Sequence, residues 1–256
     1  MEFTAIASGS NGNCYYIGND EESILIDAGI SCKQIFERTA KLNIDLSKIK
    51  GVFISHEHSD HVRGLDVFIR KTKIPIYVNK ETFDVLKLNV DNSLIKIIDS
   101  NSVTQIGDLE VTSFEKIHDA VNPVSFIVKG GGKTISVLTD IGKVCDNTIS
   151  AIKDSDVIFI ESNYDKDMLL DGPYPYFLKE RISGGLGHLS NNQAGALIIS
   201  NANPNLDFVL LSHLSDKNND PNIALNTFEN IKKVRKDLDF KTILTDRFGT
   251  IDLFRI

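Results

Sequence analysis

The sequence predicts an α/β fold in which two β-sheets pack face to face with helices on their outer sides. Short apolar runs typical of buried strands alternate with longer stretches typical of helices, and strands followed by helices recur in both halves of the chain. No internal repeat, low-complexity run or linker divides the sequence, so we expect one domain that spans residues 1–256.

The first half of the chain is expected to begin with a strand at residues 3–7. A Gly/Asn/Ser-rich turn follows at Ser8–Asn13, which is either a simple hairpin loop or a rim whose backbone N–H groups hold an anion. Next comes a hairpin whose second strand ends in Asp27, a carboxylate that the preceding apolar run would bury and that would need partners. The expected elements are strands at 14–17, 23–27, 51–55, 75–78 and 94–98, and helices at 32–42, 65–72 and 81–88.

The second half shows the same alternation. Gly130–Gly132 predicts a turn between two strands, and the pattern of Ser190 with Gln193 predicts a capping box at the start of a helix. The expected elements are strands at 103–106, 109–115, 124–129, 134–139, 156–161, 207–212, 242–245 and 250–254, and helices at 145–153, 191–200 and 221–236.

The charge, the cysteine count and the apolar runs of the sequence restrict the classes of protein to which it can belong. The net charge of −7 argues against a protein held on nucleic acid by bulk positive charge, although a local basic groove remains compatible with it. The three cysteines, Cys14, Cys32 and Cys145, are few, odd in number and widely spaced, which favours a reducing compartment. No signal peptide and no apolar run of membrane-spanning length is visible. We therefore expect a soluble cytoplasmic protein, of unknown oligomeric state, without a membrane partner.

The densest group of metal-binding side chains is His56-Glu57-His58-Ser59-Asp60-His61, which follows the apolar run Gly51–Ser55. We expect His56, His58, Asp60 and His61 to lie on a tight loop at the end of a strand, where α/β sheets place their ligands. Imidazole suits zinc, and carboxylate also tolerates manganese. The HExxH pattern of metalloproteases fails here, because the fourth residue after His56 is Asp60 and a loop is expected rather than a helix.

The loop matches the HxHxDH signature of the metallo-β-lactamase fold, an αββα four-layer sandwich. His118, Asp140 and His213 each follow an apolar strand, and their order is similar to the fold's later motifs. The resemblance implies two divalent ions, zinc or manganese: one bound by His56, His58 and His118, the other by Asp60, His61 and His213, with Asp140 as the bridge. It also implies that Asp27 braces the loop from behind the ligands.

His188 is the one histidine that this scheme does not use as a ligand. It stands just before the expected helix, and a helix N-terminus attracts anions. The resemblance to phosphodiesterases of the fold implies that His188 donates a proton to the leaving oxygen; the alternative is a capping neighbour without chemistry. Asp60 and Asp140 would take part in catalysis through the ions they bind.

The segments 161–165, 172–182 and 187–192, with the Ser8–Asn13 loop, closely resemble the YycJ/WalJ (VicX) proteins of Gram-positive bacteria. The resemblance implies a DNA exonuclease of 5′→3′ polarity that acts on DNA ends, is linked to DNA repair and to a two-component system's operon, and has a possible repair-protein partner. Tyr174 and Tyr176 can stack on bases, or can belong to a solvated helix face. The candidate substrate-binding residues are Ser10, Asn11, Asn163, Lys179, Arg181 and Ser190.

We therefore predict hydrolysis of a phosphodiester, in which the ions activate water and His188 serves as general acid. One rival is a small-molecule hydrolase of the same fold that cleaves a cyclic phosphodiester, a thioester or a lactam; a substrate panel would separate it from a nuclease. The other rival is a metal-bearing adaptor without catalysis, whose metal sites would be closed by four protein ligands.

Overall fold

The computed structural model describes all 256 residues and divides into two compact units. Unit 1 comprises residues 1–115, 120–133 and 246–256, and unit 2 comprises residues 116–119 and 134–245. That the chain forms one domain stays a prediction. None of the helices combines the length and the apolar character that crossing a lipid bilayer requires.

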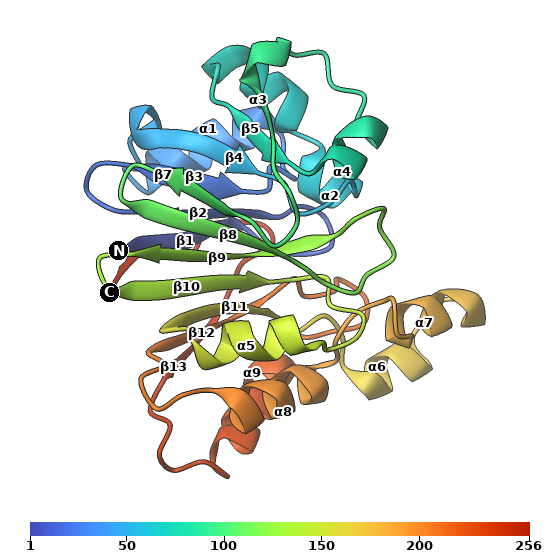
Figure 1. Cartoon of the computed structure of the whole chain (residues 1–256). Coiled ribbons are helices and arrows are strands. Elements are labelled where there is room, and N and C mark those ends of the chain that lie inside the picture. The colour runs from blue at the N-terminus through green and yellow to red at the C-terminus, as the bar shows by residue number, and fades with distance from the viewer. The chain divides into compact units, whose positions relative to one another are not determined.

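Unit 1 is built on a mixed sheet with the strand order β14-β1-β2-β3-β4-β5-β6 (Figure 1). The strands β14, β1, β2 and β3 pair antiparallel, and β3 to β6 pair parallel. Their bounds are β1 Glu2–Ala7, β2 Cys14–Gly18, β3 Ser23–Ile26, β4 Ile49–Phe53, β5 Ile76–Val78, β6 Ile95–Ile97 and β14 Phe254–Arg255. The parallel order brings the carboxyl ends of β3 and β4 to the same edge, where Asp27 and the histidine motif follow.

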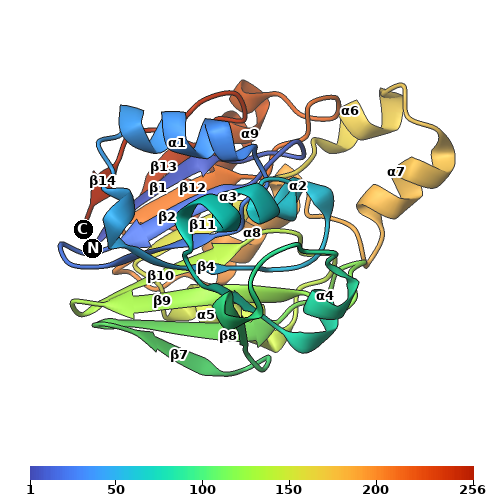
Figure 2. The ribbon, with the colours of Figure 1, turned by 90° about the horizontal axis from the view of Figure 1, so that it is seen from above.

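Two helices cover one face of this sheet, α1 (Cys32–Lys41) and α3 (Leu65–Thr72), as Figure 2 shows. Their apolar residues, Ile35 on α1 and Phe68 and Ile69 on α3, are buried in one core with Leu25 and Val52 of the sheet. The remaining strands of the unit, β7 (Val103–Ile106), β8 (Leu109–Glu115) and β9 (Val124–Gly130), form an antiparallel meander that belongs to the second mixed sheet.

Unit 2 contains four parallel strands in the order β13-β12-β11-β10. Their bounds are β10 Lys133–Leu138, β11 Val157–Glu161, β12 Phe208–Ser212 and β13 Lys241–Leu244. Every residue of β11 is buried, as expected for a parallel strand with both faces covered. The helices α5 (Asp146–Lys153), α8 (Asn191–Asn201) and α9 (Pro221–Lys232) lie along these strands (Figure 1).

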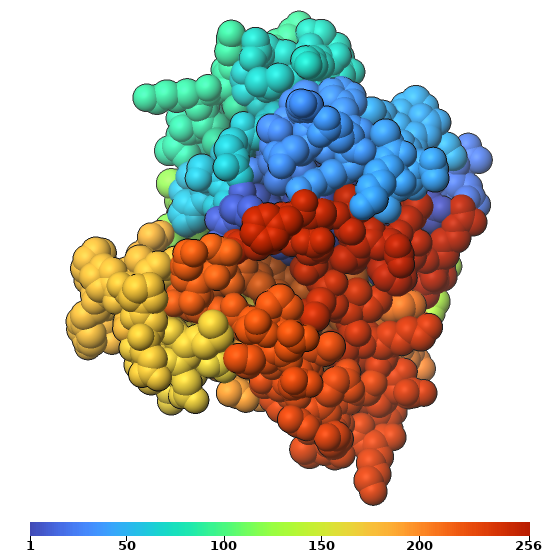
Figure 3. Space-filling model, turned by 180° about the vertical axis from the view of Figure 1, so that it is seen from behind, coloured from blue at the N-terminus to red at the C-terminus, as the bar shows by residue number.

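Unit 2 also carries a helical hairpin that the sequence analysis did not delimit. The helices α6 (Lys166–Asp171) and α7 (Tyr176–Ser183) stand out from the rest of the unit, as the yellow segment of Figure 3 shows. Asp165 caps α6 by accepting hydrogen bonds from two backbone N–H groups, and Gly172-Pro173 separates the two helices. No side chain of α7 is fully buried, so periodic burial gave no signal for this helix.

Five expected elements had wrong boundaries. The strand expected at 51–55 is β4, Ile49–Phe53, because Ile49 already pairs with Ser23 of β3, whereas the Ser55 amide bonds the Asp27 carboxylate. The helix expected at 81–88 is α4, Lys80–Val85, and it stops because Leu86 is extended and the following chain packs its apolar residues against the core. The helix expected to reach residue 236 ends at Lys232, because the chain then turns to bury Leu238 and Phe240. The strand expected at 94–98 is β6, Ile95–Ile97, because Leu94 belongs to a 3₁₀ turn at 92–94. The last strand is only Phe254–Arg255, because its partner Glu2–Phe3 lies at the end of β1.

The histidine motif also differs from the expected loop. His56 and His58 are in irregular backbone, but Asp60 and His61 belong to one helical turn, α2 (Ser59–Val62). His58 is the extended residue before this turn, with φ −59° and ψ 143°. The turn reverses the chain within four residues, and the amide of Gly64 then bonds the carbonyl of Ala28 at 2.8 Å. The motif is therefore fixed to the chain that leaves β3.

Candidate metal centre and general acid

In unit 1, Asp27 organises the histidine motif. Its Oδ1 accepts a hydrogen bond from the amide of Ser55 at 2.9 Å, and its Oδ2 accepts from the Ser55 hydroxyl at 2.8 Å and from His61 Nδ1 at 2.7 Å. Asp27 is fully buried and has a φ of +62°, a left-handed conformation that non-glycine residues seldom adopt. Its place behind the motif agrees with the bracing role predicted for it, which stays a prediction.

These hydrogen bonds determine which ring nitrogen of His56 and of His61 carries the proton. The Ser55 hydroxyl has one hydrogen and gives it to Asp27, so it accepts from His56 Nδ1 at 2.9 Å. Both His56 and His61 thus carry the proton on Nδ1, and Nε2 is the nitrogen with which each ring would coordinate a metal. Ser55 is a candidate site residue that the sequence analysis missed, because a serine at the end of a strand carries no distinctive pattern.

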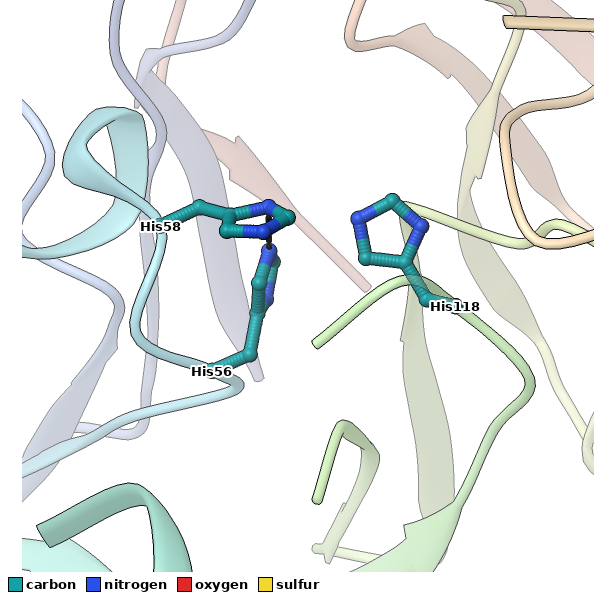
Figure 4. Close-up of side chains that lie close together, drawn as sticks. All are labelled: His56, His58 and His118. Carbon is teal, nitrogen blue, oxygen red and sulfur yellow. Dashed lines mark hydrogen bonds between the residues drawn. The ribbon is translucent and has the colours of Figure 1, made fainter. Parts of the chain in front are cut away.

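The candidate ligand atoms of the motif form two pairs. His56 Nε2 lies 3.1 Å from His58 Nδ1, the contact drawn in Figure 4, and His61 Nε2 lies 3.4 Å from Asp60 Oδ2. Two nitrogens bound to one tetrahedral zinc ion at about 2.0–2.1 Å would be about 3.3 Å apart. Both separations match this spacing, so each pair fits a single ion. His118, also shown in Figure 4, comes from the chain that follows β8.

Asn13 links the Ser8–Asn13 loop to the same motif. Its amide donates to His61 Nε2 at 3.2 Å and to Asp60 Oδ2 at 3.3 Å, and its backbone N–H donates to the Asp60 carbonyl at 2.8 Å. The predicted substrate residues Ser10 and Asn11 lie at the exposed tip of this loop, and Arg247 donates to the Asn11 side chain at 3.3 Å. The loop is therefore more than a simple hairpin turn, because it supports two candidate ligands.

Gly29 provides a test of how closely the chain after β3 packs against the histidine motif. A Cβ at Gly29 would lie 1.7 Å from the backbone oxygen of Asp60. We expect Gly29→Ala to displace the histidine motif, to cost at least about 1–3 kcal/mol of stability as overpacking does, and to lower metal occupancy. Chemical denaturation and elemental analysis would measure both effects. Gly185→Ala is the control, since nothing lies within 4 Å of its added Cβ; equal losses in both variants would contradict the explanation.

In unit 2, three strands deliver the second group of residues. The parallel register aligns Leu138 of β10, Ile160 of β11 and Leu211 of β12. The residues that come one or two positions after these aligned residues therefore meet at the carboxyl edge of the strands. They are Asp140, Glu161 and His213. Polar atoms of Asp140, Glu161, His188 and His213 lie within 4.8 Å of one another.

Asp140 lies between two histidines of this group. One carboxylate oxygen, Oδ1, lies 3.8 Å from His118 Nε2, and the other, Oδ2, lies 3.3 Å from His213 Nδ1. Asp140 and His213 both have left-handed backbones, with φ of +57° and +55°. Such conformations cost of order 1–3 kcal/mol each and concentrate at functional sites. The donor set of imidazole and carboxylate suits a divalent ion such as zinc or manganese.

The surroundings of His118, a candidate ligand, favour its neutral form. Its Nδ1 donates to the carbonyl of Gly187 at 3.1 Å, so Nε2 presents a lone pair toward Asp140. Burial disfavours the charged ring and lowers the pKa of His118 to about 4, although the carboxylate of Asp140 acts in the opposite direction. The ring is therefore neutral near pH 7, and a metal would not have to compete with a proton there.

His188 is held by Glu161, a residue that the sequence analysis did not assign. Glu161 is fully buried, and its Oε1 accepts from His188 Nδ1 at 2.6 Å. Its other oxygen accepts from the backbone N–H groups of Ile141 and Leu189, each at 3.0 Å. The signal available in the sequence was a carboxylate at the end of a wholly apolar strand. The bond occupies Nδ1 of His188, and the carboxylate can stabilise a protonated ring.

The remaining candidate residues have structural contacts. Asn163 is buried and its amide donates to the His213 carbonyl at 2.9 Å, and the Ser190 hydroxyl completes the capping box that begins α8, as predicted. Arg181 Nε donates to Asp119 Oδ2 at 2.6 Å, and the other oxygen of Asp119 lies 3.3 Å from His118 Nε2. Lys179 Nζ donates to the Leu170 carbonyl at 2.5 Å. Substrate contacts by these residues stay a prediction.

Comparison with known proteins defines the class of protein. The sequence matches the family "Beta-lactamase superfamily domain" over residues 22–204. The structure resembles that of the metallo-β-lactamase fold protein YhfI from Bacillus subtilis, with a TM-score of 0.73, 18% identity and 99% of each chain covered. The two mixed sheets flanked by helices are thus the metallo-β-lactamase sandwich that the sequence predicts, and this prediction is confirmed.

Two curated relatives narrow the class. Exodeoxyribonuclease YycJ of Bacillus anthracis is 34% identical over 227 residues, which are 88% of this chain and 86% of the relative. Exodeoxyribonuclease WalJ of Streptococcus pneumoniae is 33% identical over 235 residues, which are 90% and 87% of the two chains. The chain belongs to this YycJ/WalJ family of metallo-β-lactamase superfamily enzymes, as the resemblance in its sequence predicted, and its histidine and aspartate clusters suit divalent metal ions.

Proposed function

We propose that this protein is a metal-dependent exodeoxyribonuclease that removes nucleotides from the 5′ end of DNA. The observation that carries the proposal is the group at the edge of unit 2, where Asp140 lies between His118 and His213 and Glu161 holds His188 beside it. The names of the two relatives support the choice of DNA as the substrate. The same names support the choice of an exonuclease over a small-molecule hydrolase or an adaptor.

We assign the metal ligands as the sequence predicted. His56, His58 and His118 would hold one ion; Asp60, His61 and His213 would hold the other; and Asp140 would bridge them. The ions, when bound, supply a nucleophilic water at neutral pH and offset negative charge on the phosphate oxygens. This assignment uses the two ligand pairs of the histidine motif and the two oxygens of Asp140.

His188 would act as the general acid. The attacking oxygen forms a bond to phosphorus, the bond from phosphorus to the leaving O3′ breaks, and O3′ takes a proton from His188 Nε2. Glu161 orients the ring through Nδ1 and stabilises its positive charge before transfer. A neutral His118 does not compete for this role, because its Nδ1 is bonded to a backbone carbonyl and its Nε2 is directed at Asp140.

The metal assignment predicts two divalent ions per chain, about 3.5–4 Å apart. Elemental analysis of protein purified with zinc or with manganese, combined with anomalous scattering, would give the number, identity and separation of the ions. A fully loaded protein that contains a single ion, or two distant ions, would contradict it.

The substrate assignment predicts stepwise removal of nucleotides from 5′ ends. Manganese- or zinc-loaded protein should shorten single- or double-stranded DNA from the 5′ end and should leave circular single-stranded DNA intact. Removing the 5′ phosphate should slow cleavage. Because the net charge is −7, few phosphates should be bound, so affinity should depend only weakly on salt.

The controls separate the rival functions. Cleavage of the circle, or shortening from a labelled 3′ end, would show that the enzyme is a general phosphodiesterase or has the opposite polarity. Preference for a cyclic nucleotide, thioester or lactam over short DNA would favour the small-molecule hydrolase. Preference for RNA of the same sequence would change the assigned nucleic acid.

A further inference from the structure

A pocket of about 520 Å³ lies within unit 2, between α6, α7 and the start of α8. This volume is within the range of sites that bind small molecules, about 300–1,000 Å³. Its walls include Tyr164 and Leu169, which are buried, and the exposed ring of Tyr176. The α6–α7 hairpin that forms the pocket is the part of unit 2 that stands out in Figure 3.

The lining of the pocket combines aromatic and positively charged side chains. The lining contains two lysines, Lys166 and Lys179, and one acidic residue, Glu180, so its net charge favours an anion. Tyr176 is 76% exposed and its hydroxyl is bonded to Glu180, so folding leaves its ring unburied. Aromatic rings in this setting offer a stacking surface to a nucleobase, and lysines bind phosphate.

The pocket is continuous with the segment that carries His188. The carbonyl of Ile182, in α7, accepts a hydrogen bond from the His188 backbone N–H at 2.8 Å. Tyr164 forms a backbone bridge with Ser190, two residues after His188, and both line the pocket. Two walls of the pocket are therefore joined through their backbones to the segment that carries the proposed general acid.

We propose that this pocket binds the 5′-terminal nucleotide of the DNA, with its base against Tyr176 and its 5′ phosphate near Lys166 and Lys179. The inference rests on the proposed function, because it uses the polarity of the reaction. In 5′→3′ removal the leaving oxygen is O3′ of the terminal nucleotide, and this oxygen takes the proton from His188. The terminal nucleotide is thus on the His188 side of the scissile bond, where the pocket lies.

Binding of a mononucleotide tests the pocket separately from catalysis. Deoxyadenosine 5′-monophosphate would be titrated calorimetrically into the full-length protein, both metal-loaded and in EDTA. Tyr176→Ala should weaken binding by roughly 5–30-fold, since base stacking on an exposed aromatic ring contributes at the low end of its usual range. Tyr176→Phe should restore most of the affinity, because the ring remains. Lys166→Gln should weaken binding of the monophosphate more than binding of deoxyadenosine, which lacks the phosphate.

The matched controls are Phe177→Ala and Lys153→Gln. Phe177 is an equally exposed aromatic residue on α7 and Lys153 an exposed lysine on α5, and neither lines the pocket. Both should bind the nucleotide as the wild type does, and thermal unfolding should show that all variants are folded. Absence of saturable binding in EDTA, or equal affinity in Tyr176→Ala and wild type, would overturn the proposal.

The two proposals fail in different ways. Tyr176-dependent nucleotide binding by a protein that does not degrade DNA would support the pocket and contradict the exonuclease function. Degradation of DNA from 5′ ends by a protein whose nucleotide binding is insensitive to Tyr176 and Lys166 would overturn the pocket and leave the function standing.

Discussion

Replacing Asp140 should abolish DNA cleavage and lower the occupancy of both metal ions. One oxygen of Asp140 is directed at His118 and the other at His213, so its loss removes a ligand from each proposed ion. We expect Asp140→Asn to lose more than the roughly 10–100-fold in metal affinity or activity that removal of an outer partner of a ligand costs. Elemental analysis and initial rates on 5′-labelled DNA would measure the two effects.

The choice of asparagine keeps this test independent of folding. Asp140 has a φ of +57°, and asparagine tolerates that left-handed conformation better than alanine does. Asp154→Asn, at the exposed end of α5, is the control and should keep both ions and normal rates. An Asp140→Asn enzyme with two ions and near-normal turnover would show that Asp140 only ends a strand.

His188→Ala should keep both metal ions and lose roughly 10²–10⁴-fold in rate, which is the usual contribution of a general acid. The ring is not needed as a ligand in the assignment, and its Nδ1 is committed to Glu161. The loss should shrink on bis-p-nitrophenyl phosphate, whose leaving group needs little protonation. Steady-state rates on both substrates, with metal content measured in parallel, would test this.

Glu161→Gln separates the contribution of His188 as general acid from the contribution of Glu161, which orients it. Gln cannot present two acceptor oxygens, so either His188 Nδ1 or the backbone N–H groups of Ile141 and Leu189 lose their acceptor. The rate loss should follow the same substrate dependence as His188→Ala but should be smaller, because the imidazole remains. An equal loss for His188→Ala on both substrates would indicate that His188 positions the substrate instead.

The strands and the list of ligands were accessible from the sequence. Apolar runs marked most strands within one or two residues, and β7 and β8 lie at the expected positions. Polar residues directly after such runs, at Asp140 and His213, pointed to a site, because parallel strands present their carboxyl ends at one edge. The larger errors fell at the ends of two helices and at the last strand. Contacts between distant segments, such as the burial of Phe240 after α9, decide these boundaries.

Only the tertiary structure decided which side chains of the site form hydrogen bonds with one another. The bond between Glu161 and His188 joins residues 27 positions apart, and that between Asp27 and His61 joins residues 34 positions apart. Such pairs depend on the register of neighbouring strands and on the turns that follow them, which local composition does not encode. The sequence thus determined the family, the fold and the candidate metal-binding residues. Tertiary packing decided the hydrogen-bond partners of His56, His61 and His188, because these partners come together only in the folded chain. It also formed the pocket that Tyr176 lines.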